Sequence, residues 1–310
     1  MTLDAAAIRA WAAELGFADA GFAPAERLDG EGRHFKEWLA KGFQADMAWM
    51  ERDVEKRIDA GQFLERARTV ISLICNYYTA YRHTGEAGKI SRYAWGDDYH
   101  DIVKENLRLL AARIAEAVPD VNTRICSDTS AFMDKAWAVR AGLGWQGKHS
   151  NLITRAIGSW VFIGAIVTDL EIKSDRPIVE DHCGTCRACL DACPTGAIVE
   201  PYVVDAAKCL SYATIELRDE TLPSGIADHM EGWLYGCDIC QDVCPWNRFE
   251  RPAAEVRFEP RNGETAIAPE RILEMDHEAY VVRFRRSAIK RAKLPGLKRN
   301  AEALQRRRTD

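Results

Sequence analysis

The sequence lacks the features of a membrane or secreted protein. Its longest clearly apolar run, from Trp160 to Val167, is much shorter than the roughly 20 residues that a transmembrane helix needs. The first residues, MTLDAAAIRAWAAELGF, include Asp4 and contain no basic stretch followed by an apolar block, so they do not have the pattern of a signal peptide. These absences predict a cytoplasmic protein that engages no membrane. We also expect a monomer.

The chain as a whole lacks an excess of positive charge. Its formal net charge is −5, so the molecule as a whole does not have the charge of a nucleic-acid-binding protein. The charge is unevenly distributed, however. From Arg283 to Arg308 eleven Lys or Arg residues stand against one acid, Glu302, a stronger bias than that of an ordinary solvated helix face. This segment is therefore the candidate for binding phosphate groups.

Cysteine is abundant, and it is concentrated in one part of the chain. Eight of the ten cysteines lie between Cys183 and Cys244. A disulfide scaffold is expected in small secreted domains, so this clustering indicates metal binding instead. The other two, Cys75 and Cys126, are expected to be inert thiols in the core.

The spacing of the clustered cysteines is typical of a bacterial ferredoxin. The run Cys183-x2-Cys186-x2-Cys189-x3-Cys193-Pro194 matches the pattern for a [4Fe–4S] cluster, whose last cysteine ligates a different cluster. A shortened copy begins at Cys237, and Cys209 supplies the ligand that this copy lacks. The two predicted ligand sets are Cys183, Cys186, Cys189 and Cys244, and Cys193, Cys209, Cys237 and Cys240. A pair of zinc knuckles is the alternative, and iron content together with a broad visible absorption separates the two.

Hydrophobic patterns predict an α/β layer ahead of the cysteines. Strands are predicted at 69–78, 123–131 and 160–170, and helices at 4–15, 102–118 and 132–141. The second strand runs into a loop at Asp128, and the glycine-rich stretch 142–151 is expected to have no regular structure. Because the composition changes near 175–180, three parts are expected: residues 1–175, a cysteine-rich part 176–250, and a basic helical segment 251–310.

Two clusters form an electron relay, and the long first part should hold the cofactor that the relay serves. GLGWQG at 142–147 matches G-x-G-x-x-G but follows a predicted helix rather than a strand, which gives a dinucleotide site little support. No G-x4-G-K-[ST] occurs. The run Asp98-Tyr99-His100 lacks the glycine that would complete the cobalamin motif D-x-H-x-x-G. A cobalamin without a histidine ligand from the protein stays open.

Several stretches together resemble the epoxyqueuosine reductase family. They are EKR (55–57), RYAWGDDYHD (92–101), SDTSAFMDKAWAVRAGLGWQGKHSNLI (127–153), KCLSYATIE (208–216), IKRAKLPGLKRNAEAL (289–304) and the two cysteine runs. The resemblance implies an α/β (α+β) cobalamin-binding domain joined to a ferredoxin-like domain with two [4Fe–4S] clusters. It also implies reduction of epoxyqueuosine to queuosine at the wobble position of tRNA, with electrons from a donor that the sequence does not identify.

By the same resemblance, Asp128 matches the proton donor of the family. Asp128 would have to be protonated near neutral pH, which burial against the corrin could achieve by raising its pKa. A helix N-cap is the alternative role, because Asp-Thr-Ser ahead of a helix is good capping chemistry. Asp134, within the predicted helix, is a rival carboxyl that fits a structural or binding role better.

The resemblance also implies a set of corrin contacts. The set is Arg57, Ser91, Asp128, Lys148, His149, Ser150 and Asn151. Arg57 could instead cap a helix or join a surface ion pair, and His149 fits a polar loop residue better than a cobalt ligand. Glycines beside the last four would let the backbone approach the corrin closely. Trp95, Tyr99 and Trp145 could wall the site or belong to the core.

The basic segment is the expected tRNA contact. The residues expected to meet phosphates are Lys290, Arg291, Lys293, Lys298 and Arg299. The target nucleotide would be splayed out of the anticodon loop into the cofactor site. Two other functions stay open. One is a reductive dehalogenase-like enzyme for small molecules, which would leave the basic segment unexplained, and the other is a plain electron-transfer protein with no corrin.

Overall fold

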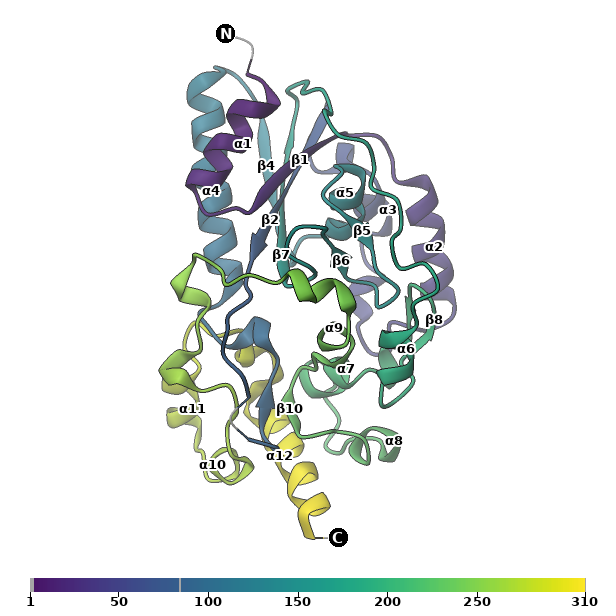
Figure 1. Cartoon of the computed structure of the whole chain (residues 1–310), viewed down its shortest axis with the longest axis vertical. Helices are drawn as coiled ribbons and strands as arrows, with labels where there is room; N and C mark the ends of the chain where they lie inside the picture. The colour runs from purple at the N-terminus through teal and green to yellow at the C-terminus, as the bar shows by residue number, and fades with distance from the viewer. Residues whose placement is uncertain (1–2, 84, 310) are drawn as a thin grey trace.

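A four-stranded antiparallel sheet lies at the centre of the first half of the molecule (Figure 1). The computed structural model describes residues 3–83 and 85–309. In spatial order the strands are β1 (Asp19–Pro24), β2 (Thr69–Asn76), β7 (Val161–Thr168) and β4 (Thr123–Cys126). Ile71 of β2 lies opposite Ile166 of β7. The three predicted strands are confirmed, each shorter than its sequence pattern.

Helices cover both faces of this sheet. They are α1 (Ala5–Glu14) and α4 (Tyr99–Ala117) on one side, and α2 (Asp29–Ala40), α3 (Val54–Ile58) and α5 (Asp134–Arg140) on the other (Figure 1). Successive strand residues point to opposite faces. Leu73 therefore packs in the core beneath α1 and α4, and Ile74 packs in the core beneath α5. An uninterrupted apolar strand needs cover on both faces, and this arrangement supplies it.

The glycine-rich stretch has regular structure, contrary to the prediction. β5 (Trp145–Gln146) pairs antiparallel with β6 (Leu152–Ile153) in a short hairpin. The turn between them is closed by the Gly147 N–H, which donates to the Asn151 carbonyl at 2.8 Å. Gly144 has to be glycine, because a Cβ there would come within 2.1 Å of the Ile153 carbonyl oxygen. Close strand approach, rather than flexibility, explains this glycine.

The cysteine-rich part consists of short elements joined by turns. These are α6 (Ala188–Ala192), β8 (Ile198–Glu200), β9 (Val203–Val204), α7 (Leu210–Ile215), α8 (Ser224–Ala227), β10 (Trp233–Tyr235) and α9 (Ile239–Asp242). β8 pairs with β9, and β10 pairs in parallel with β3 (Lys89–Ile90), which precedes α4 in the chain. The β3–β10 pair connects the first part of the chain to the cysteine-rich part.

The basic segment is helical, as predicted, and it is integrated into the molecule. Its helices are α10 (Pro269–Leu273), α11 (His277–Arg283) and α12 (Lys293–Thr309), with 3-10 turns at Val256–Phe258, Arg261–Gly263 and Ala288–Ala292. Leu297 of α12 shares one apolar core with Trp95 and Tyr235, so this core draws on all three predicted parts. Figure 1 shows α12 running beside β10. Among residues 3–83 and 85–309, none of the helices combines the length and the apolarity that crossing a membrane requires.

The remaining 3-10 turns connect these elements. They are Ala48–Met50, Ala60–Gln62, Arg92–Ala94, Ala206–Lys208 and Pro245–Phe249.

Candidate functional site

Asp128 lies in the irregular loop between β4 and α5. Its φ angle of 44° is in the left-handed region, which Asp tolerates better than most residues. The cap position of α5 is Met133, which makes no side-chain capping bond, and the helix begins at Asp134. The alternative role of Asp128 as an N-cap is therefore wrong, because five residues separate it from the helix.

The start of α4 presents two hydrogen-bond donors to the Asp128 carboxylate. The Tyr99 hydroxyl donates to Asp128 Oδ2 at 2.9 Å, and His100 Nε2 lies 2.8 Å from the same oxygen. His100 Nδ1 lies 2.7 Å from Asp98 Oδ1, which also accepts from the His100 N–H as the N-cap of the helix. A carboxylate–imidazole–carboxylate chain results, with Asp128 at its outer end and 57% of the Asp128 side chain exposed.

These contacts place the proton on His100 rather than on Asp128. Partial desolvation favours the neutral form of Asp128, but the bonds from His100 and Tyr99 outweigh it and lower the pKa of the carboxyl. Burial alone would lower the pKa of His100, but hydrogen bonds to Asp128 and Asp98 raise it to about 9. A raised pKa of Asp128 was expected from burial against the corrin, whereas the protein side chains themselves lower it. At neutral pH Asp128 is ionised and His100 carries the proton.

The carboxyl that titrates near neutrality is Asp134, the rival. Burial and the charge of Asp128 raise the pKa of Asp134 to about 7. Its Oδ1 atom is buried without a hydrogen-bond partner. The charge of Asp134 acts on Arg57, whose pKa burial lowers. Arg57 is neither a cap nor a surface ion pair: its guanidinium donates to the Trp49 carbonyl at 2.9 Å and stacks on the Trp49 ring.

The predicted corrin-contacting loop is tied to other parts of the protein by three of its four side chains. Lys148 Nζ donates to the carbonyls of Gly184 and Cys186, in the first cysteine turn. The Ser150 hydroxyl donates to the Tyr202 carbonyl at 2.7 Å. Asn151 Oδ1 accepts from Lys135 of α5 at 3.1 Å. These side chains hold the hairpin between α5 and the cysteine-rich part.

His149 is the exception in this loop. Its ring is buried, and burial lowers its pKa to about 4, so the ring is neutral at pH 7. Nδ1 accepts from the Asn151 N–H at 3.2 Å, which leaves the ring proton on Nε2. Nε2 has no partner. A protonated Nε2 donates a hydrogen bond and does not ligate a metal, and the absence of cobalt ligation by His149 stays a prediction.

Buried polar atoms without partners accumulate along this part of the chain. Besides Asp134 Oδ1 and His149 Nε2 they include Ser127 Oγ and Trp137 Nε1. Leaving such a group unsatisfied costs about 1–3 kcal/mol, so these atoms suit a bound molecule that carries its own donors and acceptors. The rim of a corrin bears amide side chains of this kind, and the residues fit the group in that respect.

The eight clustered cysteines gather into two groups of neighbours. Burial, and then the thiols of Cys244 and Cys183, raise the pKa of Cys189 to about 11, and Cys183 and Cys186 act on Cys244 in the same way. In the other group, burial raises the pKa of Cys240, and so do Cys209, Asp238 and Cys193. Cys189 of the first group also acts on Cys240, so the two groups are close to each other. Cys240 and Cys209 likewise act on Cys237. The two predicted ligand sets stay a prediction, and most of these interactions run within a set.

All ten cysteines are free thiols. Cys75 and Cys126 are buried in the cores on either face of the sheet, and burial raises the pKa of each to about 12. Both are therefore inert at neutral pH. Within residues 3–83 and 85–309, no three His, Cys, Asp or Glu side chains meet at a point suited to a single metal ion.

Ser91 contacts the cysteine-rich part. Its hydroxyl donates to Asp238, whose other oxygen accepts from the Arg92 N–H at 2.8 Å. Asp238 is almost completely buried and lies between Cys237 and Cys240 in the sequence. Ser91 therefore holds β3 against the second cysteine turn.

The five predicted tRNA contacts do not share one environment. Lys290 and Lys293 are exposed, and Lys298 is half-buried. Arg291 is exposed but bound by both carboxylate oxygens of Glu216. Arg299 is buried, and its guanidinium donates to the carbonyls of Ala213, Leu217 and Asp219. The expectation that Arg299 meets tRNA is wrong, because its guanidinium already donates hydrogen bonds inside the protein.

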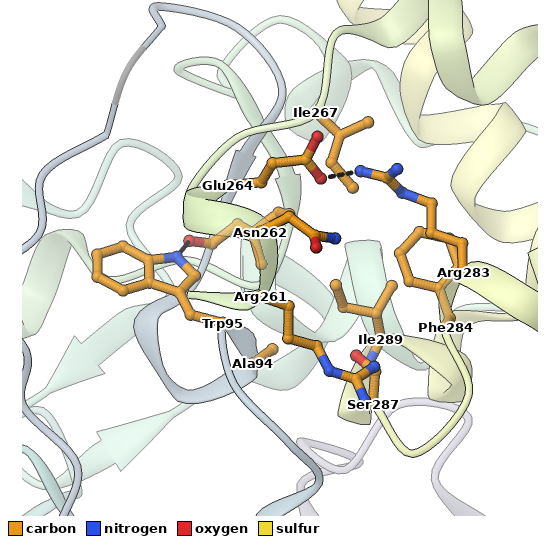
Figure 2. Close-up of a pocket in the computed structure, with 11 residues that line it drawn as sticks. Ala94, Trp95, Arg261, Asn262, Glu264, Ile267, Arg283, Phe284, Ser287 and Ile289 are labelled. Atoms are coloured by element: carbon orange, nitrogen blue, oxygen red, sulfur yellow. Dashed lines mark hydrogen bonds and ion pairs between the residues drawn. The ribbon is translucent and has the colours of Figure 1, made fainter. Parts of the chain in front are cut away.

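Two hollows lie away from the Asp128 site. One, of about 360 Å³, lies between the loop after α7 and the start of α12, where Lys293 and Lys298 face Asp219 and Glu220. The other, of about 30 Å³, has room for little more than one water molecule. Figure 2 shows Glu264 and Arg283 of this smaller hollow held together by their ion pair. Neither hollow is built for a corrin.

Comparison with known proteins identifies the family. The chain is 43% identical over 297 residues to the epoxyqueuosine reductase of Cellulophaga algicola, covering 96% of both chains. It is 46% identical over 288 residues to the enzyme of the same name from a Synechocystis strain, covering 91% of this chain and 99% of the relative. The chain belongs to the epoxyqueuosine reductase family.

Family models and solved structures agree with this assignment. Residues 57–129 match the model "Epoxyqueuosine reductase QueG, DUF1730", and residues 182–247 match a 4Fe-4S double cluster binding domain. An epoxyqueuosine reductase crystallised with an epoxyqueuosine-modified tRNA-Tyr stem loop superposes with a TM-score of 0.90 at 28% identity, covering 96% of this chain and 79% of that one. The epoxyqueuosine reductase of Streptococcus thermophilus superposes with a TM-score of 0.89 at 29% identity, covering 98% of this chain and 81% of that one.

Sequence reasoning missed two residues of this family member's site. His100 was considered only as part of an incomplete cobalamin motif, and Lys135 was not considered. The signal for His100 was its place two residues after Asp98, at the expected start of a helix. Trp95 and Trp145 belong to cores, whereas Tyr99 contacts Asp128 directly.

Proposed function

We propose that this protein reduces epoxyqueuosine to queuosine at the wobble position of tRNA, using cobalamin and two [4Fe–4S] clusters. Identity of 43–46% over more than nine-tenths of the chain to relatives named epoxyqueuosine reductase carries the proposal. The double-cluster match over residues 182–247 supports the electron supply. A plain electron-transfer protein would not need the Asp128 site, and a small-molecule dehalogenase would leave the basic segment unexplained.

We propose that residues 1–175 bind the cofactor and that the unpartnered atoms of Ser127, Asp134 and His149 face it. The neutral His149 ring would donate Nε2–H to an amide oxygen of the corrin rim, and Asp134 would accept from an amide nitrogen. When bound, cobalamin supplies a strongly reducing cobalt centre. The hairpin that carries His149 is anchored on both sides, so these atoms are held in place for the cofactor.

Electrons would reach this site through the cysteine-rich part, residues 176–250. Cys186 is the most exposed member of the two groups, so the set Cys183, Cys186, Cys189 and Cys244 is the proposed entry cluster. Cys240, of the other set, is close enough to Lys135 for its charge to act on the pKa of that lysine. The charges of Asp128 and Asp134 also act on the pKa of Lys135. The second set would therefore lie on the side of the cofactor site.

Conversion of an epoxide to an alkene takes up two electrons and two protons and releases one water molecule. Asp128 would deliver the protons to the departing oxygen. His100 holds a proton at neutral pH and shares it with Asp128 Oδ2, so the carboxylate can pass that proton on as the oxygen becomes basic. Because the Asp128 side chain is exposed, solvent can reload the pair for the second transfer.

The basic segment, within residues 251–310, would hold the tRNA. Of the five predicted contacts, Lys290, Lys293 and Lys298 are available, and Arg291 would engage phosphate only by releasing Glu216. Changing the three lysines to Gln should weaken binding of the tRNA anticodon stem loop and lower the salt slope of log Kd by about 2–3, since each phosphate contact contributes about 0.7–0.9. Fluorescence anisotropy from 50 to 300 mM salt measures both.

The exposed lysine of another region, Lys173, provides the matched control for this experiment. Lys173→Gln should leave both affinity and slope unchanged. If the triple variant keeps the slope of the parent protein, the basic segment is not the phosphate-binding surface.

Turnover of modified tRNA tests the function as a whole. Protein loaded with iron, sulfide and cobalamin, given a chemical reductant, should convert epoxyqueuosine in an anticodon stem loop to queuosine, measured by mass spectrometry of the nucleosides. Omitting cobalamin should abolish conversion. A fully loaded protein that leaves the epoxide intact would overturn the proposal.

A further inference from the structure

The first cysteine turn is held by two opposite charges. Lys148 Nζ donates to the Gly184 carbonyl at 2.5 Å and to the Cys186 carbonyl at 2.9 Å. Asp181 Oδ1 accepts from the Cys183 N–H at 2.7 Å. The turn is closed by the Cys186 N–H, which donates to the Cys183 carbonyl at 2.9 Å. Each charge therefore touches the backbone of a predicted cluster ligand.

Both charged side chains are fixed in position. The Tyr202 hydroxyl donates to the second oxygen of Asp181, and the Tyr202 N–H donates to the Lys148 carbonyl at 2.9 Å. Two hydrogen bonds, one from Tyr202 and one from the Cys183 N–H, hold the Asp181 carboxylate against the turn. Lys148 comes from the hairpin beside the cofactor site, whereas Asp181 precedes the cysteine run.

A fixed charge beside an iron–sulfur cluster changes its reduction potential. Reduction adds one negative charge to a cluster that four thiolates already make anionic. A neighbouring cation stabilises the reduced form and raises the potential, and a neighbouring anion does the reverse. Near a protein surface, such an interaction over several ångströms changes the ratio of reduced to oxidised form about tenfold.

We propose that Lys148 and Asp181 set the reduction potential of the cluster held by Cys183, Cys186, Cys189 and Cys244, with Lys148 raising it and Asp181 lowering it. Lys148 is thus a positioning and charge-supplying residue of the entry cluster. The proposal rests on the cluster assignment in the proposed function. It gives a role to two residues that the proton chemistry does not use.

A redox titration followed by electron paramagnetic resonance tests the proposal. Lys148→Gln keeps a hydrogen-bond donor but removes the charge, so at a fixed applied potential its reduced-to-oxidised ratio should be about tenfold lower, a shift of about 59 mV for one electron. Asp181→Asn should shift the ratio by a similar factor in the opposite direction. Lys148→Arg should stay near the parent protein.

The second cluster is the internal control. The reduction potential of the second cluster should be unchanged in all three variants. Cys186→Ser identifies the resonance signal of the entry cluster, because Cys186 belongs to that set alone. An unchanged entry-cluster potential in Lys148→Gln and Asp181→Asn overturns the proposal, and so does a shift of the same sign in both. If Lys148→Gln loses iron, the sign of the Asp181→Asn shift decides.

Iron analysis of the parent protein separates this test from that of the proposed function. About eight iron atoms per chain are expected for two clusters. Protein that cannot be loaded with iron contradicts the cluster assignment itself. Fully loaded protein with potentials insensitive to both charges contradicts only the role of Lys148 and Asp181.

Discussion

Asp128 and Asp134 lie six residues apart, and their surroundings act on their protons in opposite directions. Asp134, the first residue of α5, is half-buried, its Oδ1 atom is buried without a partner, and its pKa rises to about 7. Asp128, in the loop before the helix, accepts bonds from Tyr99 and His100, and its pKa falls. Burial without donors keeps a proton on a carboxyl, whereas donors remove it.

The comparison bears on where the proposed proton donor, Asp128, would store its proton. A carboxyl buried against the corrin was the expected store, whereas Asp134 is the carboxyl whose pKa burial and the charge of Asp128 raise. Asp128 instead shares an oxygen with His100, whose pKa of about 9 keeps it charged at neutral pH. The more exposed carboxylate can therefore act as a donor without being protonated at rest, because its partner holds the proton.

Removing the Asp128 carboxylate should have the largest effect. Asp128→Asn keeps the shape of the side chain but cannot relay a proton, so turnover should fall by about 10²–10⁴-fold. Iron content and bound corrin should be retained. Single-turnover conversion of the modified stem loop measures the loss.

Asp120→Asn is the matched control, because Asp120 is also exposed and also has a positive φ, of 67°. It should retain the parental rate. If Asp128→Asn turns over at that rate as well, the carboxylate is not the proton donor.

Replacing His100 should have the next largest effect and should change the pH profile. His100→Gln still donates to Asp128 but cannot store a proton, and turnover should fall about 10-fold or more at pH 7.5. Under the proposed proton relay the protonated form of His100 is the active one, so turnover of the parent protein should hold below pH 9 and decline as the pH rises through about 9. The variant should lose this decline.

A pH profile from 6.5 to 10 with a chemical reductant measures both effects. If turnover of His100→Gln still declines near pH 9, another group titrates there. His100 would then not be the proton store that distinguishes Asp128 from Asp134.

The sequence predicts best what is local. β2 and β7 were found because each is one continuous apolar run with β-branched residues. The two cysteine groups follow from ligand spacings within short turns, which the geometry of a cluster restricts. In both cases the residues that make the feature are neighbours in the chain.

Contacts between distant elements were harder to predict. Asp128 and His100 come from different elements, and no pattern in either one indicates that they meet. Lys148 lies in the loop that resembles a corrin-binding motif, yet its amine reaches Gly184 and Cys186. Arg299 lies in a strongly basic run, yet it faces inward, because a count of charges does not tell which side of α12 packs on α7.

Asp134 should affect catalysis least and stability most visibly. Its folded-state pKa of about 7 lies above its ordinary value of 3.8, so the folded protein binds the extra proton between these values. Stability should therefore fall as the pH rises from about 4 to 7 and stay lower above 7.

Asp134→Asn removes this titration. The variant should gain in Tm relative to the parent at pH 8 and gain little at pH 5, while losing less turnover than Asp128→Asn. Thermal unfolding of both proteins, free of cofactors, at the two pH values checks the prediction, and equal differences at both would show that Asp134 is ionised throughout.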